Sequence, residues 1–389
     1  MKHNWEYMKI DELGVIKSGY TPSSDELASH GDYPYFKVAE MNLPGNEKYL
    51  MYSSLYLSGE VKTFPANSIV FPKNGAAVST NKKRILQVDS VVDLNTAVMI
   101  ANQNISVHYL YYILINIDFA NLVKRGAVPT LNILELKNKI VPVPPMEVQQ
   151  QIVAELDKIN EVIEDCRELL RNLDVLARSL FYDFFGDPIS NPKGFKLKKL
   201  GEIDEISSAK RVLVKDVVDK GIPFIRGTEL ACLSKQNSFD PSIFTMFITP
   251  EHYERVKSIT GVPKPHDLLI PSINADGYIW EINTTEPLYF KDGRVLWVHV
   301  NHGVHSSKWL KFALSKIIKE KYANLSRGAV FAELTLVFLR NLDIIVPPLS
   351  LQEKFAARIE QIEAQKKTVE QTITNLQVLL DSRMDYWFN

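Results

Sequence analysis

In several loops of this 389-residue chain, cations stand beside amide and hydroxyl side chains, a combination suited to binding a nucleic acid. In the first half, Lys73-Asn74-Gly75 is followed by the run from Ser79 to Arg84. Lysine and arginine neutralise phosphates, whereas amides and hydroxyls hydrogen-bond to base edges. In the second half, Lys210-Arg211 and the run from Ser272 to Tyr278 are comparable. The alternative for each loop is a solvated surface.

Two pairs of cations also recur at matching places in the two halves of the chain. Lys37 matches Arg226, and Arg125 matches Arg327. The predicted DNA contacts are Lys37, Lys73, Asn74, Thr80, Asn81, Lys82, Lys83, Arg84, Arg125, Lys210, Arg211, Arg226, Ser272, Asn274, Tyr278 and Arg327.

No persuasive catalytic motif accompanies these loops. The sequence has no Gly-x-x-x-x-Gly-Lys-Ser/Thr phosphate loop, and Val143-Pro144-Pro145-Met146 lacks the polar first residue of an amino-methyltransferase motif. Glu60-Val61-Lys62 lacks the upstream Pro-Asp of a nuclease site. The histidines of His299 to His305 could ligate zinc only if their side chains converged. We predict a solvated loop there, and no catalytic residue, metal site or cofactor in this chain.

Composition describes an ordinary soluble globular protein, with 46% hydrophobic residues and a net charge of −1. The segment 146–186 has 4 basic and 9 acidic residues, so any DNA contact should come from the flanking segments. Without an apolar leader or a long apolar run, we predict a cytoplasmic protein. The two cysteines, Cys166 and Cys232, are too far apart to indicate a disulfide framework.

The chain contains a long internal repeat. Arg125-Gly126-Ala127-Val128 returns as Arg327-Gly328-Ala329-Val330. The Pro-Pro pair before Gln149 returns before Gln352, at an offset of 352 − 149 = 203 residues. A repeat of this length is a whole domain plus a helix.

Each copy ends in a helical pattern whose apolar residues recur in steps of three and four, as in a coiled coil. The predicted seam consists of Ile152, Leu156, Ile159, Ile163, Leu170, Leu173, Phe355, Ile359, Ile362, Val369, Ile373 and Leu376. Lys366 interrupts it, either to fix register or as a snorkelling side chain. A second row, Val162, Leu169 and Leu176, either packs on the chain's own domains or docks another subunit.

We therefore predict an α+β fold with a pseudo-twofold internal repeat. Two mixed α/β globular domains, residues 1–145 and 187–348, are separated by two long coiled-coil helices, residues 146–186 and 349–389. The helices should be antiparallel, because the second domain starts where the first helix ends. Such a pseudo-dimer should read two different half-sites on DNA.

This doubled order resembles the specificity subunit of type I restriction-modification systems. The match is carried by Ile140 to Gln151, Ser179 to Gly186, Ile344 to Gln352 and Ser382 to Phe388, although the second helix ends at Asn389 instead of glycine. The resemblance implies two target recognition domains that each read one half of a bipartite, asymmetric double-stranded DNA site, with the helices as spacer.

The resemblance also implies a non-catalytic subunit that works through partners. Two modification (methyltransferase) subunits would methylate adenine from S-adenosylmethionine, and restriction subunits would use ATP and Mg in the full complex. Three alternatives remain from the residues alone: a methyltransferase, a bivalent protein-binding scaffold, and a stand-alone DNA-binding regulator. S-adenosylmethionine binding by the isolated chain would favour the first, and a lack of salt-sensitive DNA binding the second.

Overall fold

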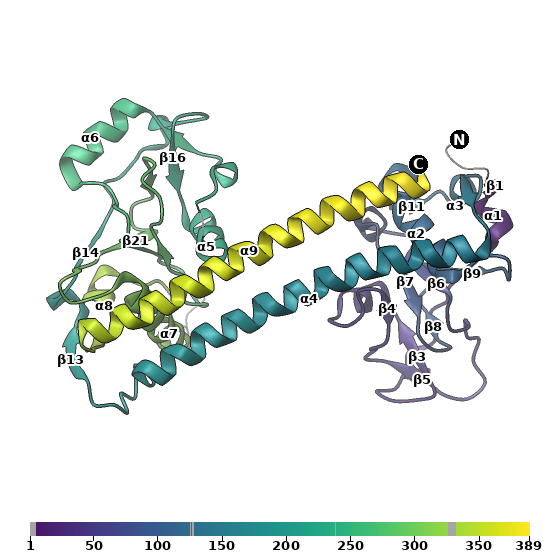
Figure 1. Cartoon of the computed structure of the whole chain (residues 1–389), viewed down its shortest axis with the longest axis horizontal. Helices are drawn as coiled ribbons and strands as arrows, with labels where there is room; N and C mark the ends of the chain where they lie inside the picture. Colours follow the sequence, from purple (N-terminus) through teal and green to yellow (C-terminus); the bar gives the residue numbers. More distant parts are fainter. Residues whose placement is uncertain (1–4, 125, 127, 238, 326–331) are drawn as a thin grey trace. The chain divides into compact units, whose positions relative to one another are not determined.

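A computed structural model of the protein describes residues 5–124, 126, 128–237, 239–325 and 332–389. It divides into two compact units: unit 1 comprises Met1–Arg167 and Glu370–Asn389, and unit 2 comprises Glu168–Val369. The divisions fall inside two 40-residue helices, α4 (Met146–Phe185) and α9 (Leu349–Phe388) (Figure 1). Each unit therefore contains one globular domain and part of each long helix.

The domain of unit 1 is built on a five-stranded sheet with the order β2-β9-β6-β7-β4, next to a three-stranded sheet, β5-β3-β8, and two-stranded pairs. In Figure 1, β6, β7 and β9 lie close to α4, and β3 and β5 lie farther from it. The elements are β1 (Glu6–Lys9), α1 (Ile10–Leu13), β2 (Gly14–Ser18), β3 (Tyr33–Phe36), β4 (Tyr49–Leu50), β5 (Tyr56–Leu57), β6 (Ile69–Pro72), β7 (Arg84–Leu86), β8 (Val91–Val92), β9 (Thr96–Ala101), α2 (Val107–Asn116), β10 (Val123–Lys124), β11 (Thr130–Leu131), α3 (Ile133–Lys137) and β12 (Ile140–Val143).

The domain of unit 2 has two four-stranded sheets, β14-β21-β18-β19 and β15-β17-β16-β20. Figure 1 shows α8 beside the start of α9, and α6 far from it. The elements are β13 (Lys196–Lys199), β14 (Glu205–Ser208), β15 (Val217–Val218), β16 (Ile222–Ile225), α5 (Gly227–Gln236), β17 (Phe247–Ile248), α6 (Pro250–Thr260), β18 (Leu268–Pro271), β19 (Trp280–Glu281), β20 (Tyr289–Phe290), β21 (Val295–His299), α7 (Ser307–Leu325), α8 (Leu336–Arg340) and β22 (Asp343–Val346).

The two domains have the same arrangement of paired strands, the strand frame. β9 pairs antiparallel with β2 and β6, and β21 pairs in the same way with β14 and β18. β3 runs parallel to β8 as β16 runs parallel to β20, and the antiparallel pair β1-β12 corresponds to β13-β22. This topology confirms the α+β fold with two related domains.

The copies differ between these shared strands. Unit 2 inserts α6 before β18, whereas residues 58–68 of unit 1, all of which the structure describes, contain no helix. The helix after β9 in unit 1, α2, ends at Asn116. The chain then forms a 3-10 turn, Phe119–Leu122, whose first turn is capped by Asp118 accepting a hydrogen bond from the Ala120 amide at 2.9 Å. The insertions thus leave the frame intact.

The ends of α4 follow from local sequence. At its start, the Pro145 carbonyl accepts hydrogen bonds from the amides of Val148 and Gln149. At its end, Gly186 takes a positive φ of 71° and donates its amide to the Tyr182 carbonyl. Glycine adopts this left-handed conformation with little strain, which is why it commonly ends helices.

The predicted seam residues are most deeply buried where the long helices pack on a domain. The buried members are Ile152, Leu156, Ile159, Ile163, Leu173, Phe355, Ile359 and Ile362, and the half-buried ones are Leu170, Val369, Ile373 and Leu376. In unit 1, Ile152 and Leu156 join the core formed by α2 and the large sheet. In unit 2, Phe355 and Ile359 join the core around α7. Among the described residues, no helix is long and apolar enough to cross a membrane.

Candidate nucleic-acid interface

The loop that follows β6 is fixed by the segment that leads into β11. The Lys73 carbonyl accepts the Leu131 amide at 2.8 Å, and Gly75 donates to the Pro129 carbonyl at 2.8 Å. In unit 2, the Ser272 carbonyl accepts the Leu334 amide at 2.7 Å, at the corresponding place after β18. Both copies therefore hold this strand-end loop through the same backbone contact.

The side chain of Lys73 leaves this loop at the domain surface. Its ammonium donates to the Ser18 hydroxyl at 2.7 Å, and partial burial lowers its pKa. Thr80 is exposed, and Lys82 is half-buried with its ammonium bonded to the Asn42 side chain. These side chains can all reach a ligand at the surface, so their DNA contacts stay predictions.

Lys83 is a correction to the predicted interface. Its side chain is 0% exposed, and its ammonium donates to the Ile117 carbonyl at 2.9 Å and to the Asn81 side chain. The ammonium also lies 3.8 Å from the ring centre of Phe119. Burial lowers the pKa of Lys83 to about 7. A side chain enclosed in this way holds the loop together and cannot contact DNA.

The neighbours of Lys83 also have internal partners. Asn81 adopts a left-handed φ of 55°, and its side-chain oxygen Oδ1 accepts the Phe119 amide at 2.9 Å. The Arg84 guanidinium donates to the carbonyls of Met41, at 3.0 Å, and Lys83, at 2.8 Å. These contacts position the loop between β6 and β7.

Ser272 and Asn274 are also corrections, because their side chains are only 1% and 2% exposed. The side-chain oxygen of Asn274 accepts the Tyr278 amide at 2.7 Å, and its nitrogen donates to the Tyr278 carbonyl at 2.8 Å. Asn274 therefore closes the turn instead of reading a base. Tyr278 itself is half-buried, with the ammonium of Lys235 5.0 Å from its ring centre.

The remaining predicted cations occupy different settings. Lys210 and Arg211 are exposed on the loop before β15. Arg226 pairs with the buried Glu229, whose side chain also accepts the Arg226 amide at 3.1 Å, and the hydrogen bond to this carboxylate raises the pKa of Arg226.

Lys37 caps a short helix in the matching way. Its backbone amide donates to Glu40 at 2.9 Å, which repeats the contact of Arg226 with Glu229. Asn74 is half-buried and forms a backbone bridge with Thr130. The predicted contacts Arg125 and Arg327 lie outside the described residues.

Sequence reasoning missed two anchoring residues, Gln149 and Gln352, although the repeat contained the signal. Gln149 is buried; it accepts the Ser106 amide at 2.8 Å and donates to the Pro144 carbonyl at 2.8 Å. Gln352 accepts the Ser306 amide at 2.9 Å and donates to the Pro347 carbonyl at 2.9 Å. Each glutamine thus joins the first turn of a long helix to the start of a domain helix, α2 or α7.

A second set of contacts attaches each domain farther along its helix. In unit 1, Lys48 pairs with Asp157 of α4 at 2.5 Å, and the Tyr112 hydroxyl also donates to Asp157. In unit 2, Lys308 pairs with Glu363 of α9 at 2.6 Å, and Asn237 donates to the same carboxylate at 2.8 Å. Domain and helix are therefore cross-linked by charged hydrogen bonds in both units.

The two long helices are themselves joined by ion pairs. In unit 1, Arg383 of α9 donates to both carboxylate oxygens of Glu155 of α4, one of them at 3.0 Å. In unit 2, Lys366 of α9 pairs with Asp174 of α4. Lys366 therefore has a partner across the seam.

The predicted solvated loop is confirmed only for the middle of the histidine cluster, where His302 is exposed. His305 is fully buried and its Nδ1 lies 2.7 Å from the Asp204 carboxylate. The Nε2 of His299 lies 2.7 Å from the Ser207 hydroxyl. No three possible ligands among His, Cys, Asp and Glu come together to hold a metal ion within the described residues. His305 instead joins Asp204 to the core near Trp309.

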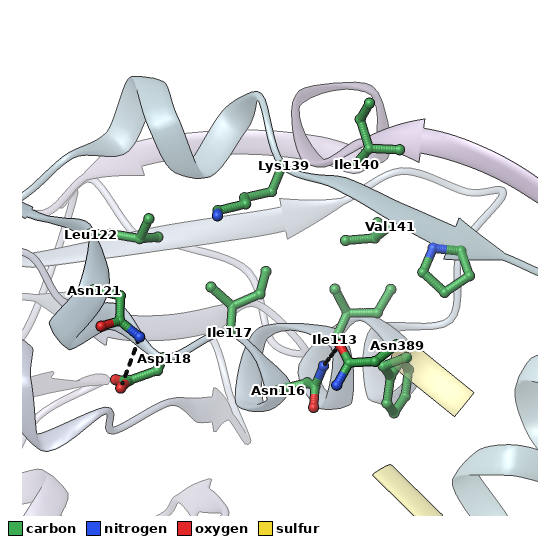
Figure 2. Close-up of a pocket in the computed structure, with 12 residues that line it drawn as sticks. Ile113, Asn116, Ile117, Asp118, Asn121, Leu122, Lys139, Ile140, Val141 and Asn389 are labelled. Atoms are coloured by element: carbon green, nitrogen blue, oxygen red, sulfur yellow. Dashed lines mark hydrogen bonds between the residues drawn. The ribbon is translucent and has the colours of Figure 1, made fainter. Parts of the chain in front are cut away.

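One cavity of about 270 Å³ lies in unit 1, at the end of α2. Figure 2 shows Lys139 and Val141 on one side of it and Ile117 and Asn116 on the other. The Asn116 side chain bonds to Asn389 at 3.1 Å across one end. The described residues that line the cavity include no cluster of charged groups that would indicate a catalytic site.

Comparisons with known proteins agree with this architecture. Residues 2–170 match the type I restriction modification DNA specificity domain. A putative type I restriction enzyme specificity subunit from Haemophilus influenzae is 22% identical over 92% of this chain and 87% of its own length. The MjaIX specificity subunit of Methanocaldococcus jannaschii is also 22% identical, with the same coverage of both chains.

Solved structures share the fold. The S subunit of a type I restriction-modification system from M. genitalium has a TM-score of 0.55 and 16% identity, over 100% of this chain and 97% of that one. A chain from a study of complex assembly and conformational transition in the type I R-M system has a TM-score of 0.61 and 17% identity, over 98% and 96%. Residues 2–170 therefore match the type I DNA specificity domain, and the chain as a whole is similar to type I restriction-modification specificity subunits.

Proposed function

We propose that this chain is the DNA sequence-specificity subunit of a type I restriction-modification complex, and that it selects the DNA site without performing the chemistry itself. The observation that carries this proposal is the repeated frame: two domains of the same topology, each anchored to its own long helix by a buried glutamine. The specificity-domain match over residues 2–170 supports it.

Each domain reads one half of a bipartite, asymmetric DNA site. The strand frame is common to both domains, but the surface loops differ in length and in side chains, as the insertion of α6 illustrates. Because loops supported by a rigid scaffold usually carry binding specificity, diverged loops should read different bases. The candidate cations at the surface include Lys73, Lys82, Lys210 and Arg211.

The long helices set the distance between the two half-sites. A helix of 40 residues spans roughly 60 Å at about 1.5 Å per residue. At about 3.4 Å per base pair, half-site centres on straight DNA are then at most about 18 base pairs apart. The antiparallel contacts within each unit suit a spacer, since Glu155 near the start of α4 meets Arg383 near the end of α9.

The helices also dock two modification subunits. Leu169 and Leu176 are each 46% exposed on α4, and Val378 and Leu379 are exposed on α9. Apolar side chains at solvent-facing helix positions commonly mark a protein contact. The modification subunits would bring S-adenosylmethionine, and restriction subunits with ATP and Mg would join them. A bivalent protein scaffold or a stand-alone regulator would instead act without these subunits.

A map of methylated adenines tests the proposal. Cells that carry this gene with its modification partner are compared with cells lacking this gene alone. We expect one split, asymmetric methylation motif to disappear on deletion. An unchanged map, with the modification subunit expressed and active, would favour the protein scaffold or the regulator.

A further inference from the structure

The ion pairs between α4 and α9 do not follow the internal repeat, because they do not recur at the equivalent positions of the two copies. In unit 1, Glu155 binds Arg383 through two oxygens and also accepts the Trp387 indole N–H at 3.1 Å. The hydrogen bond from Arg383 lowers the pKa of Glu155. In unit 2, Asp174 pairs with Lys366. In both pairs the acid lies on α4 and the base on α9.

The offset of 203 residues identifies the counterpart of each charge on the other helix. Glu155 of α4 corresponds to Arg358 of α9, and Arg383 of α9 corresponds to Leu180 of α4. A repeat that kept its charges would place a second ion pair between residues 180 and 358. Leu180 instead packs against the core of unit 2, and Arg358 is exposed. The charge pattern therefore tells the two helices apart, although their apolar patterns match.

We propose that these ion pairs select the pairing of α4 with α9 and reject the pairing of either helix with the same helix of a second copy of the chain. The repeated apolar seam alone cannot make this choice, because two copies of one helix could meet through it in the same antiparallel register. Specificity then requires interactions that disfavour the wrong partner.

Pairing α9 with a second α9 would be repulsive. In the register of the repeat, Arg358 of one copy takes the place of Glu155 and lies opposite Arg383 of the other. This happens twice in a symmetric pair. Two guanidinium groups that face each other across a helix pair repel, so they disfavour association of the two α9 helices, most strongly at low salt.

Pairing α4 with a second α4 would leave carboxylates without hydrogen-bond or ion-pair partners. Glu155 would lie opposite Leu180, and Asp174 would lie opposite Ile163, the counterpart of Lys366. Glu155 would lose the donors that it has in unit 1, Arg383 and Trp387. A carboxylate without partners beside apolar side chains is unfavourable. Only the α4–α9 pairing satisfies all four charges.

The test reverses one charge in the full-length chain. Arg383→Glu places two carboxylates together in unit 1. In an α9–α9 pair, the same substitution creates two attractions between Arg358 and the new carboxylate at position 383. Sedimentation velocity on the purified chain at low salt measures the mass. We expect the mass of a single chain for the parent and the mass of a dimer for Arg383→Glu. The affinity of the variant for a second copy of itself should be at least about tenfold higher than the parent's.

Two further variants locate the new contact. Adding Arg358→Glu to Arg383→Glu should return the mass to one chain, although Arg358 makes no ion pair in the structure described. Adding Glu155→Arg should also return it to one chain, because the intrachain pair is restored with reversed polarity. If circular dichroism shows Arg383→Glu unfolded, Arg383→Gln replaces it, with the same direction and a smaller shift. The proposal is overturned if the folded variant keeps the parent's mass, or if Arg358→Glu leaves the dimer intact.

Discussion

In unit 1 the recognition domain is attached to α4 through Asp157, which receives Lys48 and a tyrosine hydroxyl, whereas in unit 2 Glu363 of α9 receives Lys308 and Asn237. The glutamine anchors at the start of each helix, by contrast, are the same in both copies. The two copies have therefore diverged without losing the shared strand topology or the glutamine anchors. The divergence changed the side chains that attach each domain farther along its helix.

The largest effect is expected at the shared anchors. Gln149→Leu removes two hydrogen bonds and leaves a serine amide and a proline carbonyl unpaired. Gln352→Leu removes the same two contacts and a third, because Gln352 also donates to the Val304 carbonyl at 3.0 Å. We expect each variant to lower the free energy of unfolding by about 2–4 kcal/mol. Urea unfolding measures the loss, and hydrogen exchange should place it in the mutated unit.

The exposed neighbour Gln150 provides the control, because Gln150→Leu removes no hydrogen bond of this anchor. If Gln149→Leu were tolerated while Gln352→Leu was not, the anchors would not be equivalent, and the shared frame would need another explanation.

The stability of unit 1 should depend on pH, because unit 1 contains the buried Lys83. Its pKa is lowered to about 7 in the folded domain, against 10.5 for an exposed lysine. Between these values the unfolded chain binds more protons, so the stability of unit 1 should rise with pH, by at most about 1.4 kcal/mol per unit. The penalty is complete below pH 7 and absent above 10.5.

Thermal unfolding of wild type and Lys83→Met between about pH 7 and about pH 9 checks this slope. The variant should lack the rise in unit 1. An equal rise in both proteins would show that Lys83 is not the titrating group.

The diverged contacts should have smaller and unequal effects. Glu363→Gln leaves Lys308, whose side chain is only 15% exposed, with Glu281 at 3.6 Å as its remaining acidic partner. Asp157→Asn affects Lys48, which is more exposed. We expect losses of about 1–2 and about 1 kcal/mol, respectively, by urea unfolding. Equal losses, or a larger loss for Asp157→Asn, would contradict this ranking.

The smallest effect is expected at the surface of the candidate interface. Lys82→Ala in the complex reconstituted with modification subunits should weaken DNA binding equally for all sequences and reduce the slope of log affinity against log salt by about 1. Changed sequence preference with an unchanged slope would show that Lys82 reads bases instead of phosphates.

The repeated frame was predictable from sequence because it depends on the spacing of apolar residues and on the residues that mark where helices begin and end. The steps of three and four before Phe185 predicted α4, and the Pro-Pro pair marked its start. The seam residues Ile152 and Phe355 are buried, each in the core of its own unit. These signals are local and survive without knowledge of tertiary contacts.

The candidate interface was less predictable because side-chain burial depends on distant segments. Lys83 and Lys82 are neighbours in sequence, yet only Lys83 is enclosed, by Phe119 and the Ile117 carbonyl. Asn274 closes a turn onto Tyr278, a use of amides that sequence alone does not distinguish from base reading. The anchors were visible as repeated glutamines, but their partners Ser106 and Ser306 lie more than forty residues away in sequence.

The most direct test of the account removes one heptad from each helix, residues 164–170 and 367–373, which keeps both interhelical ion pairs. The map of methylated adenines in cells carrying this variant with its modification partner is then compared with the parent's. Seven residues correspond to about 10 Å, or about three base pairs. We predict a motif with both half-sites unchanged and a spacer shorter by about three base pairs. An unchanged spacer, or an altered half-site, in an active variant would contradict the account.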